Sequence, residues 1–144
     1  MTPQERLDEL VKGQNPSLIA KLPSGFAVIG DSQFLPGYCL LLAYPMVEKL
    51  NDLQGDGRLQ FLADMAKLGD AVLKATNCLR INYSIYGNLD PFLHAHIFPR
   101  YHWEEDAYRT SPPMQIPAEL RGDPKAAFDP VRHADLMQAI RDRI

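Results

Sequence analysis

The stretch Phe92-Leu93-His94-Ala95-His96-Ile97-Phe98-Pro99-Arg100 sets two histidines into an apolar run that favours a β-strand. Successive side chains of a strand point to opposite faces of the sheet, so His94 and His96 share one face, flanked by Phe92 and Phe98. The other face is apolar and consists of Leu93, Ala95 and Ile97. We expect Pro99, which lacks an N–H for the ladder, to end the strand. Two imidazoles on the open face of a sheet indicate catalysis or metal binding.

A second strand is predicted just before this one, over 79–85. Its alternation places Arg80, Asn82 and Ser84 on one face, and we expect that face to match the histidine face of the following strand. Residues 86–91 carry Gly, Asn, Asp and Pro, and they have the length and composition of a hairpin loop.

The remaining pattern predicts an α+β domain with an antiparallel sheet, a long helix packed on one face and a C-terminal tail. Residues 2–12 read as a helix with Thr2 as its N-cap. Strands are expected over 26–30 and 38–44, the second apolar on both faces and therefore central. The long helix is predicted over 58–75, capped by Asp56. Its expected buried stripe comprises Leu62, Met65, Ala66, Gly69, Val72 and Leu73. We expect an extended surface segment over 111–124 and a last helix that opens at Asp129.

Length and composition indicate one domain over residues 1–144. The net charge of -3 gives no general attraction to nucleic acid, and no apolar run reaches the length of a membrane span. The N-terminus does not have the pattern of a signal peptide. Cys39 and Cys78 both lie in apolar runs and are interpreted as reduced, buried thiols. We therefore expect a cytoplasmic protein that binds neither membrane nor nucleic acid.

The stretch His94-Ala95-His96-Ile97-Phe98-Pro99-Arg100 resembles the end of the histidine triad (HIT) motif, in which three histidines alternate with apolar residues, often before Pro-Arg. The resemblance extends over about residues 20–103, through the Pro36-Gly37 turn, the long helix and Ile81-Asn82-Tyr83. Residues 104–144 form a proline-rich segment and a C-terminal helix outside this core. Phe92 occupies the first histidine position, which is a departure from the motif.

The resemblance implies a bacterial-type HIT-like fold and a nucleotide hydrolase or nucleotidyl transferase that acts at an α-phosphate. Family substrates are dinucleoside polyphosphates, such as diadenosine polyphosphates, and nucleoside phosphoramidates. His94 takes the position of the nucleophile, which would form a nucleotidyl-histidine, and His96 would stabilise charge or assist the leaving group. The resemblance also implies a homodimer. The motif requires no cofactor, although Mg²⁺ is compatible with a polyphosphate substrate.

Four further residues are candidate substrate ligands. Asn82 shares the histidine face, Asn88 precedes the motif, Asp31 follows a strand, and Arg100 closes the motif. Each also has a structural interpretation: a strand hydrogen bond for Asn82, turns for Asn88 and Asp31, and a local carboxylate partner for Arg100. Two alternatives to an enzyme stay open. One is a nucleotide-binding or sensing protein with weak turnover, which Phe92 motivates. The other is a metal-binding protein in which His102, Glu104 or Asp106 joins His94 and His96.

Overall fold

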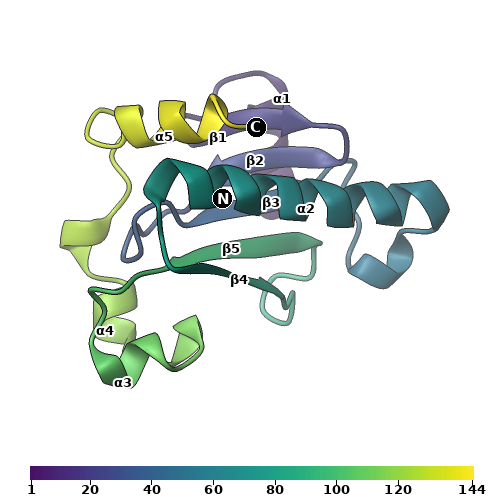
Figure 1. The fold of residues 1–144 in the computed structure, drawn as a ribbon. Helices are drawn as coiled ribbons and strands as arrows, with labels where there is room; N and C mark the ends of the chain where they lie inside the picture. Colours follow the sequence, from purple (N-terminus) through teal and green to yellow (C-terminus); the bar gives the residue numbers. More distant parts are fainter.

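Five antiparallel strands form one sheet in the order β1-β2-β3-β5-β4, in a computed structural model that describes all residues from Met1 to Ile144 (Figure 1). The strands are β1 Leu18–Leu22, β2 Gly25–Ile29, β3 Cys39–Ala43, β4 Arg80–Ile85 and β5 His94–Arg100. The α+β prediction is confirmed, and β3 is the central strand as its apolar pattern predicted. Strand β1 was not predicted, because its five residues are too few for a clear alternation.

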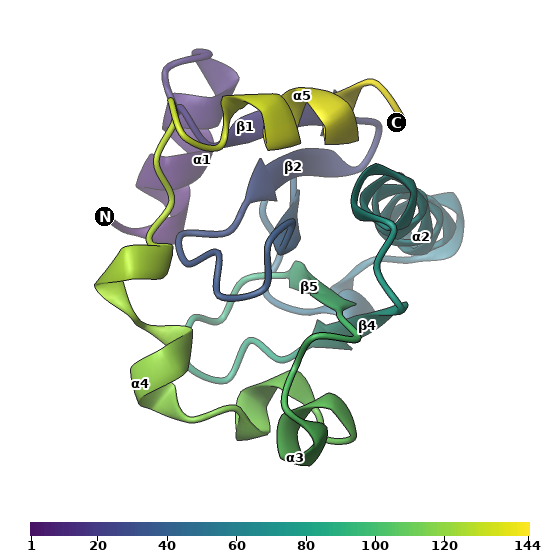
Figure 2. The same cartoon turned by 60° about the vertical axis from the view of Figure 1, so that its left-hand side comes forward.

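Three longer helices cover the sheet: α1 Pro3–Val11, α2 Gly55–Thr76 and α5 Ala134–Arg141. The main core lies between α2, α5 and the face of the sheet that carries Leu41, Ala95 and Ile97. A second core packs α1, through Leu7 and Leu10, against the opposite face of the sheet. Figure 2 shows α1 and α2 on opposite sides of the strands. The histidine face is therefore covered by α1 at one end and open beyond it.

Helix α1 begins as its sequence predicts. The Thr2 hydroxyl accepts the Glu5 N–H, and the Glu5 carboxylate in turn accepts the Thr2 N–H. This reciprocal capping satisfies two N–H groups that the first turn would otherwise leave unpaired.

The start and the buried face of α2 differ from the prediction. The helix begins at Gly55 with Gln54 as its N-cap, so Asp56 lies inside the first turn and is not the cap. The buried residues are Phe61, Asp64, Leu68, Gly69, Ala71 and Val72, whereas Ala66 and Leu73 of the expected stripe are exposed. The buried face of α2 differs from the prediction because it includes Asp64, a charged residue that a hydrophobic pattern assigns to solvent. Its carboxylate is buried because it accepts hydrogen bonds from the Ser24 N–H and hydroxyl and from Gln60.

The expectation that Pro99 ends its strand is wrong, because β5 continues to Arg100. The Arg100 carbonyl accepts the Leu79 N–H, so the backbone polar groups of Arg100 face the β4 side and those of Pro99 face away. On that other side the pairing with β3 has already ended at Ile97. No hydrogen bond is lost at a proline whose nitrogen faces an unpaired edge.

The expectation of an extended surface segment is wrong, because the segment after β5 is made of short helical turns. These are α3 Asp106–Arg109, the 3-10 turn Pro113–Gln115, α4 Ala118–Arg121 and the 3-10 turn Pro124–Ala126. Proline fits the first position of a helical turn, which is where Pro113 and Pro124 lie. Helix α5 starts at Ala134 rather than Asp129, since residues 129–133 form a turn before it. A further 3-10 turn, Leu50–Asp52, precedes α2. None of the helices combines the length and the apolar character needed to cross a membrane.

Candidate active site

His94 lies at the start of β5 with one ring nitrogen fixed. Its Nδ1 is 2.8 Å from the backbone carbonyl oxygen of Phe92. A carbonyl can only accept a hydrogen bond, so Nδ1 carries a proton, and in the neutral form of the ring Nε2 is the nitrogen with the lone pair. The Phe92 ring stacks on the imidazole, with centroids 4.3 Å apart. The residue at the first motif position therefore orients His94 through its backbone, a contact that does not depend on the side chain there.

His96 is fixed in the opposite tautomer by a tyrosine that directly precedes the neighbouring strand β3. The Tyr38 hydroxyl is 2.6 Å from His96 Nδ1. Burial raises the pKa of Tyr38, so the phenol keeps its proton, and we assign the O–H as the donor to Nδ1. Burial, with a smaller effect of His94, lowers the pKa of His96 to about 4. His96 is then neutral at pH 7 and presents an Nε2–H donor.

The packing around Tyr38 leaves its ring little freedom. It stacks on Phe98 at a centroid distance of 4.5 Å and meets Phe34 edge-on. On its other side a Cβ atom at Gly30 would lie 2.5 Å from the tyrosine ring, so only glycine leaves room for it. The hydroxyl is thus held against His96 by contacts from β5 and from the connection between β2 and β3.

The two imidazoles stand between two cavities. Their ring centroids are 5.0 Å apart. One cavity, of about 310 Å³, is lined by apolar side chains of β2 and β3 and by Asp31, Arg6 and Tyr38. The other, of about 460 Å³, is lined by the 86–90 loop and Met114. Both include His94 and His96, so a group held between the two cavities would lie against both rings.

Asp31 and Asn88 both lie near the histidines, in different cavities. Asp31 lines the apolar cavity, is largely exposed, and forms an ion pair of 3.3 Å with Arg6 of α1. Asn88 is exposed in the loop that lines the second cavity. The structure therefore brings these two predicted ligands to opposite sides of the histidine pair.

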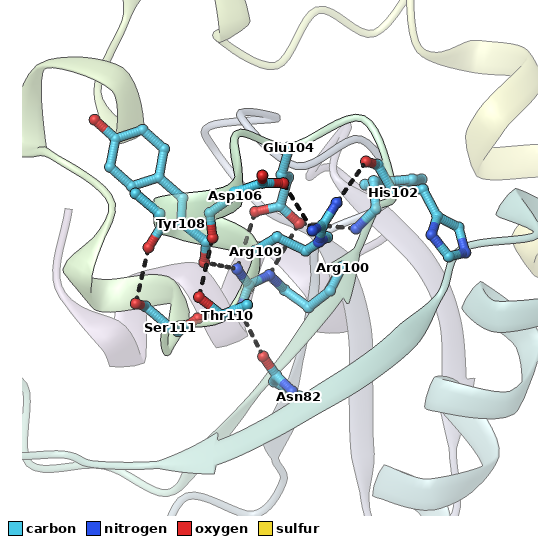
Figure 3. Close-up of polar contacts among 11 residues, drawn as sticks. Asn82, Arg100, His102, Glu104, Asp106, Tyr108, Arg109, Thr110 and Ser111 are labelled. Carbon is cyan, nitrogen blue, oxygen red and sulfur yellow. Dashed lines mark hydrogen bonds and ion pairs between the residues drawn. The ribbon is translucent and has the colours of Figure 1, made fainter.

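Arg100 is engaged entirely within the protein (Figure 3). Its Nε and Nη2 donate to the two carboxylate oxygens of Glu104, at 3.1 and 2.9 Å. The remaining donors bond the carbonyls of Tyr108 and Ser111 and the Asn82 side-chain oxygen. A guanidinium has five N–H donors, and all are used here. The structure thus assigns Arg100 the local carboxylate partner, and not the role of a phosphate ligand.

Asn82 lies on β4 beside this network. Its Oδ1 accepts from Arg100, and its amide N–H₂ group makes no hydrogen bond within the protein. The register pairs Asn82 with Phe98 and Ser84 with His96, so the predicted match between the polar face of β4 and the histidine face is confirmed. Asn82 lines a separate cavity with Ser84 and Tyr86, and does not line either cavity at the histidine pair.

No group of three or more His, Cys, Asp or Glu side chains converges in the chain as metal ligands would. Glu104, one of the expected third ligands, is buried in its ion pair with Arg100. The residues present do not supply the third ligand that the metal-binding alternative needs.

Tyr38 is the site residue that the sequence analysis missed. One signal was available: in the predicted strand over 38–44, Tyr38 alternates with Leu40 and Leu42, as Tyr44 does, and therefore shares their face. The register places Leu40 opposite His96 and Leu42 opposite His94, so that face is the one that carries the site.

No protein-family model matches the sequence, and no curated protein matches it. Solved structures do match. A histidine triad protein from Bradyrhizobium japonicum has a TM-score of 0.71 at 23% identity, over 88% of this chain and 89% of its own. A histidine triad (HIT) protein from Sinorhizobium meliloti has a TM-score of 0.70 at 17% identity, over 88% of each chain.

A more distant match comes from Sulfolobus tokodaii. It is a hypothetical histidine triad nucleotide-binding protein with a TM-score of 0.71 at 12% identity, over 95% of this chain and 89% of its own. These matches agree with the resemblance that the His94–Arg100 motif indicated. This chain has the fold of the histidine triad proteins.

Proposed function

We propose that this protein is a HIT-type nucleotide hydrolase or nucleotidyl transferase with His94 as its nucleophile. The observation that carries the proposal is the hydrogen bond between His94 Nδ1 and the Phe92 carbonyl, which leaves Nε2 as the nitrogen available for attack beside the cavities. The similar fold of the hypothetical histidine triad nucleotide-binding protein from Sulfolobus tokodaii supports the same class of ligand.

In the first step the Nε2 lone pair of His94 forms a bond to the α-phosphorus. The bond from phosphorus to the leaving group breaks, and the leaving group departs with that electron pair. The His96 Nε2–H donates a hydrogen bond to a phosphate oxygen and keeps its proton, which stabilises the negative charge. Because His96 is neutral, this stabilisation is that of a hydrogen bond and not of an ion pair.

In the second step a water oxygen attacks phosphorus, the nitrogen–phosphorus bond breaks, and the nucleoside monophosphate leaves. The water proton passes to solvent, and His94 recovers its lone pair. An acceptor other than water would make the same chain a transferase. Mg²⁺, if present, would arrive with a polyphosphate substrate.

The apolar cavity suits the nucleoside. Val28, Leu40 and Leu42 provide apolar surface for a base, and Asp31 provides a carboxylate for ribose hydroxyls. The Asp31 carboxylate is largely exposed, so its ion pair with Arg6 is weak enough for a hydroxyl to compete.

We also propose a homodimer formed through the β4 edge. The sheet has two edge strands, β1 and β4. The β1 edge is covered, since the Arg141 guanidinium donates to the carbonyls of Leu18 and Ile19. The β4 edge is not paired and carries exposed Leu79 and Tyr83. An open edge is a template for pairing with a second copy. Light scattering checks this: a monomeric wild-type mass would overturn the dimer.

The test of the catalytic proposal is to trap the intermediate. The protein is incubated with diadenosine tetraphosphate or adenosine phosphoramidate and quenched in alkali. Mass spectrometry then examines the peptide that holds His94. We expect a nucleotidyl adduct on His94, and a fall in turnover of roughly 10⁴-fold or more for His94→Asn. His133→Asn, on the far side of the fold beside Phe128, is the matched control. Nucleotide binding without an adduct or product would favour the sensing alternative.

A further inference from the structure

One buried side chain closes the connection between β2 and β3, residues 30–38, which carries Tyr38. Gln33 lies in the middle of this connection and is 5% exposed. Its Nε2 donates to the carbonyls of Gly30 and Tyr38, at 2.9 and 3.0 Å. Its Oε1 accepts the Gly37 N–H at 2.9 Å. Both amide hydrogens and the amide oxygen are therefore used, and every partner is a backbone group at one of the two ends of the connection.

These hydrogen bonds fix the backbone at the point where Tyr38 leaves a tight turn. The Tyr38 N–H donates to the Leu35 carbonyl at 2.9 Å, and the Tyr38 carbonyl accepts the Gly30 N–H at 2.9 Å. Gly37 precedes the tyrosine with a φ of 97°, in the left-handed region that favours glycine. Gln33 is the one side chain that bonds the backbone of Gly37 and Tyr38. The direction in which the tyrosine ring leaves the backbone therefore depends on Gln33.

The outer half of the same connection is held separately, by the C-terminal segment. The Gln33 N–H donates to the Ala126 carbonyl at 2.6 Å, and the Phe128 N–H donates to the Asp31 carbonyl at 2.8 Å. Both are bonds between backbone groups, so a substitution of the Gln33 side chain leaves them in place. Loss of the side-chain amide should therefore release the half of the connection that carries Tyr38 and leave the rest of the fold intact.

We propose that Gln33 is a positioning residue for the active site, whose amide holds Tyr38 so that the phenol donates to His96 Nδ1. The catalytic consequence rests on the proposed function, whereas the positioning itself does not. With the phenol in place, His96 carries its proton on Nε2 and can donate to a phosphate oxygen. If the phenol moves away, the imidazole can take the other tautomer, which turns a lone pair toward the phosphate and loses that hydrogen bond.

The first test reads the His96 tautomer in the free protein by ¹⁵N NMR. Gln33→Met keeps the length of the side chain and removes all three hydrogen bonds. Gln60→Met is the matched control, because it removes the 2.8 Å hydrogen bond from Gln60 to Asp64 within α2, on the other face of the sheet. We expect a mixture of the two tautomers in Gln33→Met and the wild-type tautomer in Gln60→Met.

A second variant covers the case in which Gln33→Met does not fold. Gln33→Glu has the same size and keeps an acceptor for the Gly37 N–H, but its carboxylate lacks the two N–H donors to the carbonyls of Gly30 and Tyr38. The same mixture of His96 tautomers is expected. A single wild-type tautomer in either folded variant would overturn the proposal.

The second test asks whether Gln33 acts through Tyr38. Gln33→Met should lower kcat by about three- to tenfold and change KM by less than about twofold, which is no more than the effect expected of Tyr38→Phe. The double variant should then have the kcat of Tyr38→Phe alone, because the two substitutions remove the same interaction. Losses that multiply in the double variant would show that Gln33 acts by another route and would refute the proposal. If the wild type shows no turnover, the proposed function fails and the His96 spectra alone decide the positioning.

Discussion

Replacing Arg100 by glutamine is expected to destabilise the protein strongly. Both side chains of the Arg100–Glu104 pair are 4% exposed, so the substitution leaves a carboxylate buried without its cation. Breaking a buried pair by removing one partner costs about 3–5 kcal/mol. Glutamine also leaves the carbonyls of Tyr108 and Ser111 without their donors. The free energy of unfolding of a typical domain is about 5–15 kcal/mol in total, so the variant is expected to be only marginally stable.

The assay is urea unfolding monitored by circular dichroism. The slope of the unfolding free energy against urea concentration should be the same in all variants. Arg109→Gln is the matched control. Arg109 lies in the same segment, but its partner Asp106 is 89% exposed. The loss of unfolding free energy should therefore stay below about 1 kcal/mol. Combining Arg100→Gln with Glu104→Gln removes the orphaned charge and should restore part of the stability. The reasoning is refuted if Arg100→Gln costs less than about 1 kcal/mol and instead raises KM, because the guanidinium would then bind substrate.

Three further predictions concern the site. Tyr38→Phe removes the donor to His96 Nδ1 and should lower kcat about tenfold with a smaller change in KM. In this variant, ¹⁵N NMR of His96 should show a mixture of the two tautomers. A spectrum unchanged from wild type would contradict our assignment. Gly30→Ala puts a Cβ atom 2.5 Å from the Tyr38 ring, so it should reproduce that loss of kcat and cost about 1–3 kcal/mol of stability; wild-type kinetics would show that the ring position is unimportant. The pKa of His96 is about 4, below its unfolded value of about 6.5, so the stability gained by keeping it neutral is complete above pH 6.5 and is lost as the pH falls toward 4. The full difference corresponds to roughly 3 kcal/mol, which solvent screening of this partly exposed ring reduces to about 1–2 kcal/mol. Urea unfolding at pH 7 and pH 4.5 should show a smaller acid loss in His96→Gln than in wild type, and equal losses would disprove the assignment.

Local periodicity determined much of this protein. The two-residue repeat of the motif strand put His94 and His96 on one face, and the same repeat put Asn82 and Ser84 on the matching face of β4. Thr2 and Glu5 specified the start of α1. These features could be predicted because they depend on residues within a few positions of each other, where backbone geometry fixes the side-chain direction.

Only the tertiary structure decided which polar groups meet. Tyr38 is 58 positions from His96, and its hydroxyl sets the His96 tautomer only because β3 lies beside β5. Asp64 is buried because Ser24, 40 positions away, donates to it. Arg100 donates to Glu104, Tyr108 and Ser111 of the segment after β5, of which only Ser111 lies in the part that was expected to be extended. A periodic pattern records whether a residue suits water or the core, but the partner of a buried polar group is chosen by chain topology, which brings distant segments into contact.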